Sequence, residues 1–172
     1  AEKKLPGAVV LVGRGDRIVY QKAIGQRALE PAREAMTLDT IFDVASLTKV
    51  VATTAATMML VDRGKLRVDD PVVRSLPDFR GEGKDSVTIR DLLMHRSGLP
   101  AGRVLRKGSG PASARRVVLT TPLVRQPGSR SEYSDLGLDV VGFVVERVTR
   151  EPLDRFLRRA VYDPLGMRST MF

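Results

Sequence analysis

The alternation of apolar and polar positions predicts a β-rich segment followed by a mostly helical one. Residues 7–13 form a compact apolar run, and residues 17–24 form a second run rich in strand-forming residues, with Gly15 and Asp16 between them. Two such runs around a Gly-Asp turn predict a β-hairpin. Residues 25–42 are mixed in polarity and rich in turn formers, and we expect no long element there.

The strongest helix signal covers residues 47–63, which contain neither glycine nor proline, and Gly64 is a natural stop after it. Apolar residues surround this helix on almost every side, so we expect it to be buried. Met58 and Met59 are expected to fill space in the core. The apolar positions are Val50, Val51, Ala55, Met58, Met59 and Leu60.

Four further segments have helical patterns, and short connections separate them. The segments are 86–95 with Thr88 as its cap, 111–120, 136–148, and 152–161 with a proline near its start. Residues 65–77 and 101–111 are the expected connection and loop, and Pro127-Gly128 breaks the chain before the 136–148 helix. A hairpin followed by helices indicates an α+β fold.

Composition narrows the chemistry. The chain has 172 residues, 42% of them hydrophobic, which suits one globular domain. It has no cysteine, which excludes disulfides, thiolate chemistry and cysteine-based zinc sites. The one histidine, His95, cannot build a multi-histidine metal site. We therefore expect neither a metal nor a cofactor.

The formal net charge of +9 raises the hypothesis of a basic nucleic-acid-binding domain. The basic residues occur in pairs and not in long runs, and the few aromatic residues are not interleaved with arginine. This pattern disfavours a nucleic-acid partner and favours a solvated, arginine-rich surface. No apolar run approaches the ~20 residues of a transmembrane helix, so no membrane span is expected.

One short motif carries the candidate chemistry. Ser46-Leu47-Thr48-Lys49 opens the long apolar helix, and residues three apart lie on one helix face, so the Lys49 amine can reach the Ser46 hydroxyl. A serine hydroxyl needs a base to accept its proton before it is a good nucleophile, and a lysine with a depressed pKa can serve. Ser-x-x-Lys is also a loose pattern that occurs by chance, and its place at the start of a buried helix is what favours a functional interpretation.

Ser-x-x-Lys is a signature of β-lactamases and penicillin-binding proteins, and the whole chain resembles that superfamily. The likeness is strongest to the class C β-lactamase-like branch with its esterases and D,D-peptidases. Six blocks match in order: residues 5–12, 42–49, 64–71, 89–100, 127–135 and 163–167. The resemblance implies an antiparallel sheet with flanking helices and a helical subdomain, incomplete in this chain.

The resemblance also implies a function and its residues. It implies a serine hydrolase that forms an acyl-enzyme on a β-lactam, a D-alanyl peptide or a small ester, with Ser46 as nucleophile. Tyr133 matches the tyrosine of the family's Tyr-x-Asn motif and would move protons with Lys49. Asp135 replaces the asparagine. An ionised aspartate only accepts hydrogen bonds, so Asp135 could pair with Lys49 and hold it charged.

The chain ends at Phe172, before the position of the family's third motif, Lys-Thr-Gly or His-x-Gly. We therefore expect a partial domain, with a hairpin and lead-in over 1–45 and a mainly helical region over 46–172. A complementary C-terminal chain or segment is an expected partner, because the later strands and one donor of the oxyanion hole would come from it.

Two alternatives stay open at this point. The first is a non-catalytic ligand-binding or sensor module of the same fold, which Asp135 and the missing third motif favour. The second is a Ser-His mechanism through His95, which is disfavoured because the family's use of that block is structural. The resemblance implies a periplasmic, secreted or envelope-associated protein, although the absence of cysteine also fits the cytoplasm.

Overall fold

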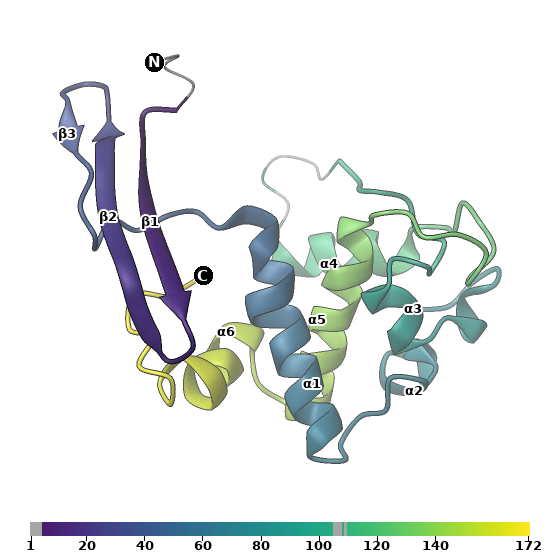
Figure 1. The fold of residues 1–172 in the computed structure, drawn as a ribbon. Helices are drawn as coiled ribbons and strands as arrows, with labels where there is room; N and C mark the ends of the chain where they lie inside the picture. The colour runs from purple at the N-terminus through teal and green to yellow at the C-terminus, as the bar shows by residue number, and fades with distance from the viewer. Residues whose placement is uncertain (1–4, 105–107, 109) are drawn as a thin grey trace. The chain divides into compact units, whose positions relative to one another are not determined.

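The fold is described from a computed structural model, over residues 5–104, 108 and 110–172. The chain forms two compact units, Ala1–Asp43 and Val44–Phe172. Figure 1 shows strands in the first and helices in the second.

The first unit is a three-stranded antiparallel sheet. Strands β1 (Gly7–Arg14) and β2 (Arg17–Ala28) form the predicted hairpin, with Arg14 paired to Arg17 and Gly7 to Gly25. The two-residue strand β3 (Glu34–Ala35) pairs with the end of β2, in a segment where we expected no long element. Most large apolar side chains of the hairpin are exposed, including Leu11, Ile18 and Val19.

The predicted helix over 47–63 is present but is not one regular α-helix. It begins with the 3-10 turn η1 (Ala45–Leu47), continues as the wider π-helical segment η2 (Lys49–Thr54), and becomes α-helical in α1 (Ala55–Asp62). Gly64 ends it with φ +65°, a left-handed conformation that glycine adopts without a Cβ clash. π-Helical turns occur frequently at functional sites, and here one carries Lys49.

The prediction that this helix is buried on all sides was wrong. Ala52, Ala56 and Leu60 are buried in the core, but Val50 is 63% exposed and Met58 is 41% exposed. The described residues of the second unit pack on only one side of it, chiefly through the helix α5 (Asp135–Thr149). Met58 is therefore not core filler.

The remaining helices follow their predicted positions closely. α3 (Ile89–Leu93) is shorter than expected but starts at Thr88, whose hydroxyl accepts the Asp91 N–H in a capping box. α4 (Pro111–Thr120) matches its prediction, and α5 extends the predicted helix by one residue at each end. The last predicted helix divides into α6 (Leu153–Leu157) and the π-helical η4 (Arg158–Tyr162).

Two short helices lie between α1 and α3, where the sequence indicated only a connection and the start of a helix. They are α2 (Val72–Ser75) and the 3-10 turn η3 (Lys84–Ser86). The core of the second unit gathers around α5, whose Val140, Val141 and Val144 are fully buried. Figure 1 shows α5 beside α1, with α3 and α4 also against it. Contacts of α5 with η2 and α1 place the start of α5 close to the turns that lead into α1, where the candidate site residues lie.

No helix in the described part of the chain has both the length and the apolar character needed to cross a membrane.

Candidate active site

Three of the four residues proposed from the sequence, Ser46, Lys49 and Tyr133, meet at the Ser46 hydroxyl. The Lys49 ammonium donates to Ser46 Oγ over 3.1 Å, and the Tyr133 hydroxyl donates to the same oxygen over 2.8 Å. Lys49 Nζ lies 5.1 Å from the centre of the Tyr133 ring. Tyr133 is 87 positions from Ser46 in the sequence, so the fold and not local spacing brings them together.

The fourth residue, Asp135, contacts Lys49 and not Ser46. Its carboxylate lies 2.7 Å from Lys49 Nζ, which makes the ion pair that the sequence raised as a hypothesis. The Lys49 side chain is 19% exposed and that of Asp135 is 58% exposed. The amine is therefore shielded from water on most sides while its partner is half in solvent.

The backbone presents Ser46 at a strained turn. Ala45 has φ +44°, in the left-handed region that residues with a Cβ rarely adopt. Such a conformation costs about 1–3 kcal/mol and is found where the surrounding structure imposes it, often at active sites. Ser46 follows directly, in the first turn of the helix, and is exposed. The nucleophile candidate is thus both accessible and fixed in direction.

The loop that carries Tyr133 is attached to the segment after α3. Ser134 caps α5 by accepting the Gly137 N–H at 3.3 Å, and its hydroxyl donates to Pro100 O at 2.6 Å. The Asp135 N–H donates to Ala101 O at 2.8 Å. The block 96–101 therefore holds the start of α5, and with it Tyr133 and Asp135, in place.

Gly98 shows why this block needs a glycine. It has φ +81°, and a Cβ there would lie 2.2 Å from Arg125 O. The close approach allows the Val124 N–H to donate to Gly98 O at 2.8 Å. Any larger residue would push apart the segments around Gly98 and Arg125, which support the tyrosine loop.

The cluster shifts the protonation of its own members. Burial lowers the pKa of Lys49, but hydrogen bonds with Asp135 and Tyr133 outweigh it, so its pKa is raised overall. The hydrogen bond with Lys49, and then that with Ser46, lowers the pKa of Tyr133. The lysine is therefore held charged, and the tyrosine is the group whose proton is easier to remove than usual.

His95 is the residue that sequence reasoning placed outside the site and that the structure places against it. Its ring lies 4.6 Å from the Tyr133 ring, centre to centre. It makes no hydrogen bond to Ser46 among those of the described residues, which agrees with the rejection of a Ser-His pair. Nothing local in the sequence connects His95 with Tyr133, 38 positions later, so only the fold could show the contact.

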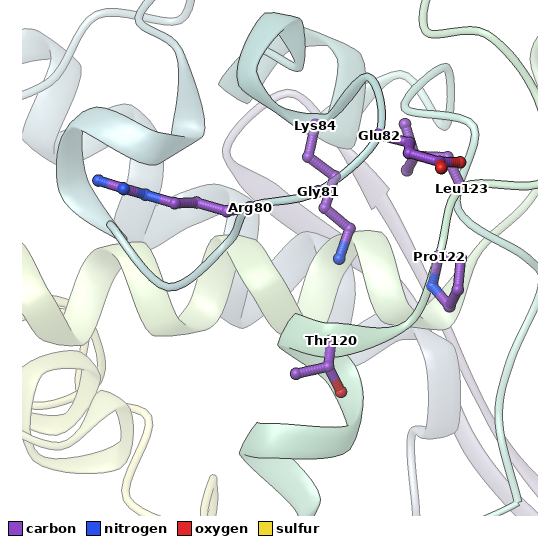
Figure 2. A pocket seen from close by; sticks show the side chains of 7 residues that line it. All are labelled: Arg80, Gly81, Glu82, Lys84, Thr120, Pro122 and Leu123. Atoms are coloured by element: carbon purple, nitrogen blue, oxygen red, sulfur yellow. The ribbon is translucent and has the colours of Figure 1, made fainter.

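A pocket of about 280 Å³ lies elsewhere in the second unit. Figure 2 shows its lining, with the Lys84 side chain directed toward the end of α4 that carries Thr120. Lys84 is 2% exposed, and its ammonium donates to Leu119 O at 2.6 Å. That carbonyl belongs to the last turn of α4, where carbonyls lack partners within the helix, so we interpret Lys84 as a helix cap. No cluster of three or more metal-ligating side chains occurs among the described residues.

The chain is similar in sequence to known proteins along its whole length. A protein-family model described as Beta-lactamase matches residues 1–172. A protein of Escherichia coli K12 named "Putative D-alanyl-D-alanine carboxypeptidase" is 34% identical over 189 residues, covering 97% of this chain. The chain spans 43% of that relative's length.

Solved structures show the same relationship. A protein from Bacteroides dorei DSM 17855 that is named "putative beta-lactamase" superimposes on this chain with a TM-score of 0.79 at 32% identity. The octameric penicillin-binding protein homologue from Pyrococcus abyssi gives a TM-score of 0.81 at 28% identity. The alignments cover 95% and 96% of this chain, and 47% and 40% of those chains. The expected α+β, β-lactamase/transpeptidase-like fold is confirmed.

Proposed function

This chain belongs to the beta-lactamase family, and from that premise we propose that it carries the nucleophile half of a serine hydrolase that works through an acyl-enzyme. The observation that carries the proposal is the double hydrogen bond to Ser46 Oγ, from Lys49 at 3.1 Å and from Tyr133 at 2.8 Å. The phenol of Tyr133, with its lowered pKa, can lose its proton and then accept the proton of the Ser46 hydroxyl. The positive charge of Lys49 stabilises the phenolate that acts as this base.

The charges of the cluster assign the roles. Because Asp135 holds Lys49 charged, Lys49 does not act as the base in the resting site. Tyr133, once deprotonated, is the base for Ser46, and the Lys49 ammonium stabilises the phenolate. Asp135 is thus a positioning residue that acts through Lys49.

The reaction then proceeds in two balanced steps. Ser46 Oγ attacks the substrate carbonyl carbon while Tyr133 takes its proton, and the tetrahedral intermediate collapses with transfer of that proton to the leaving nitrogen or oxygen. The acyl group remains as an ester on Ser46. Water attacks this ester with Tyr133 again as base, and the released acid and the free Ser46 hydroxyl complete the cycle.

The substrate class that the relatives favour is a peptide ending in D-alanyl-D-alanine, since the Escherichia coli relative is named for that activity. β-Lactams and small esters present the same acyl chemistry and are the other two candidates. A D-alanyl peptide is a bacterial cell-wall component, so this choice carries with it an envelope, periplasmic or secreted location. No nucleic-acid partner is proposed.

The experiment is a product assay on the protein expressed from its complete gene. It is incubated with a peptide ending in D-alanyl-D-alanine, with a chromogenic β-lactam and with a p-nitrophenyl ester, and the released D-alanine, opened lactam and nitrophenol are measured. We expect release from the peptide that disappears in Ser46→Ala. Release that persists unchanged in Ser46→Ala contradicts the proposal.

The non-catalytic binding module is a second candidate, favoured by the Lys49–Asp135 ion pair because a lysine held charged is a weaker base. It predicts that Ser46 is acylated once and that the ester persists. A stable adduct without product release in the same assay supports this candidate over the hydrolase.

A further inference from the structure

His95 contacts the tyrosine loop through three separate groups. Its Nδ1 accepts the Ser134 N–H at 3.1 Å, and its carbonyl accepts the Glu132 N–H at 2.8 Å. Its ring lies against the Tyr133 ring at 4.6 Å, with the planes inclined by 33°. The residues on both sides of Tyr133, and Tyr133 itself, are therefore held by one residue.

The backbone of His95 is set for this contact. It has φ +55°, the left-handed conformation, directly after α3 and its cap Met94. Its own N–H donates to Leu92 O at 3.1 Å, which closes the end of the helix. A non-glycine residue in this conformation costs stability, so the position is held by its surroundings and aims the ring at the loop.

Other residues fix the same loop as well. Ser131 Oγ donates to Met94 O at 3.1 Å before Glu132, and the Ser134 hydroxyl donates to Pro100 O at 2.6 Å after Tyr133. His95 differs from them in contacting Glu132, Tyr133 and Ser134 together.

We propose that His95 is a positioning residue whose neutral ring holds Tyr133 within hydrogen-bonding distance of Ser46. The proposal rests on the proposed function, because His95 acts through Tyr133. Nδ1 can accept the Ser134 N–H only while that nitrogen carries no proton. Protonation turns the acceptor into a donor that faces another donor, which breaks this hydrogen bond and displaces the backbone next to Tyr133.

The groups that face the ring favour its neutral form. Lys49 reaches it from η2, Tyr133 and the Ser134 N–H face it from the loop, and Asp135 faces it from the start of α5. Burial, and then the Lys49 charge, lower the pKa of His95, and the Asp135 charge opposes this only in part. The ring is therefore neutral at pH 7, and the tyrosine is released as the pH falls below the lowered value.

Two substitutions test the hydrogen-bond acceptor of His95 and its aromatic ring independently. His95→Asn keeps an acceptor near the position of Nδ1 and tolerates the left-handed backbone, since asparagine adopts that conformation more readily than most residues. His95→Phe keeps a ring against Tyr133 but has no acceptor. Both are compared with wild type after denaturant unfolding has established the range in which each variant is folded.

The first measurement is the rate of Ser46 acylation against pH. We expect His95→Phe to lose about 10²-fold in the acylation rate constant, the effect of displacing a reacting group by about 1 Å, with the half-saturating probe concentration within about twofold. His95→Asn should retain most of the rate. In wild type the slope of the logarithm of the rate against pH should increase from one to two as the pH falls through the His95 pKa. In His95→Asn this slope should stay at one.

The second measurement does not depend on activity. The chain has three tyrosines, Tyr20, Tyr133 and Tyr162, and the ultraviolet titration of Tyr133 is obtained by difference from Tyr133→Phe. In His95→Phe the pKa of Tyr133 should rise toward its ordinary value, because the Tyr133 hydroxyl moves away from Lys49 and Ser46. An unchanged Tyr133 titration, or a folded His95→Phe that acylates at the wild-type rate, overturns the proposal.

The two measurements distinguish failure of the His95 role from failure of the hydrolase proposal. Ser46-dependent acylation with no effect of His95→Phe removes the role of His95 and leaves the hydrolase proposal intact. Absence of acylation in wild type removes the hydrolase proposal. In that case a shifted Tyr133 titration still shows that His95 positions the tyrosine.

Discussion

Lys49 and Asp135 form an ion pair with 2.7 Å between the ammonium nitrogen and the carboxylate oxygen. Asp135 stands where the family motif has asparagine, so a group that could donate a hydrogen bond is replaced by one that carries charge. The pair raises the pKa of Lys49 above its ordinary value despite the burial of the amine. In the proposed function, this ion pair makes Tyr133 and not Lys49 the base.

Asp135→Asn removes the charge that keeps Lys49 protonated. The pKa of Lys49 should fall, so the alkaline limb of the acylation profile should move to lower pH. Asp139→Asn is the control, because Asp139 lies one helical turn later on α5 and no hydrogen bond joins it to Lys49 among the described contacts. Equal shifts in the two variants would contradict the role given to Asp135.

Lys49→Met removes the main cause of the lowered Tyr133 pKa. The tyrosine pKa should rise toward about 10, so less phenolate is present at neutral pH. The acidic limb of the acylation profile should move to higher pH, and the rate at pH 7 should fall because less Tyr133 phenolate is present. A profile that keeps its acidic limb shows that Tyr133 is not the base.

Thr88→Ala removes the capping box of α3, in which the Thr88 hydroxyl accepts the Asp91 N–H at 3.1 Å. Its free energy of unfolding should fall by about 0.5–2 kcal/mol, measured by urea unfolding. Ser86→Ala is the matched control, because among the described residues the Ser86 hydroxyl bonds Gly83 O alone, in an exposed turn. The acylation rate of folded Thr88→Ala should match wild type, since the cap touches none of the site residues.

Lys84 should make stability depend on pH. Burial lowers its pKa in the folded protein, so between that value and the ordinary pKa of 10.5 the unfolded chain binds more protons than the folded one. Stability relative to Lys84→Met should therefore rise as the pH rises through this window. The comparison is made by urea unfolding from pH 7 to pH 10, and a difference that is flat or falls with pH contradicts the assignment.

Local patterns predicted much of this fold because its elements are set by local features. The Gly15-Asp16 turn specifies the hairpin, Thr88 marks the start of α3, and the apolar period of residues 136–148 specifies α5. The exposure of Met58 was not predictable, because burial depends on which elements are present to cover a helix and not on the helix itself. The π-helical winding at Lys49 also left no signal in the residue pattern.

The candidate site divides in the same way. Ser46 and Lys49 are three residues apart, so helix spacing alone indicated that they meet. Tyr133 and Asp135 were reached through the family resemblance, and the structure places both within contact of that pair. His95 and Lys84 could be placed only from the fold, since their partners are 38–39 and 35 positions away.

The central claim is that Ser46 is a nucleophile activated by its two neighbours, and the most direct test is intact-mass spectrometry after treatment with a serine-reactive fluorophosphonate. Wild type should gain the mass of one adduct, which peptide mapping places on Ser46. Ser46→Ala should gain none, and Ser86→Ala, which alters an exposed hydroxyl that donates to Gly83 O outside the tyrosine loop, should label as wild type does. An unlabelled wild type, or an adduct that persists in Ser46→Ala, contradicts the account.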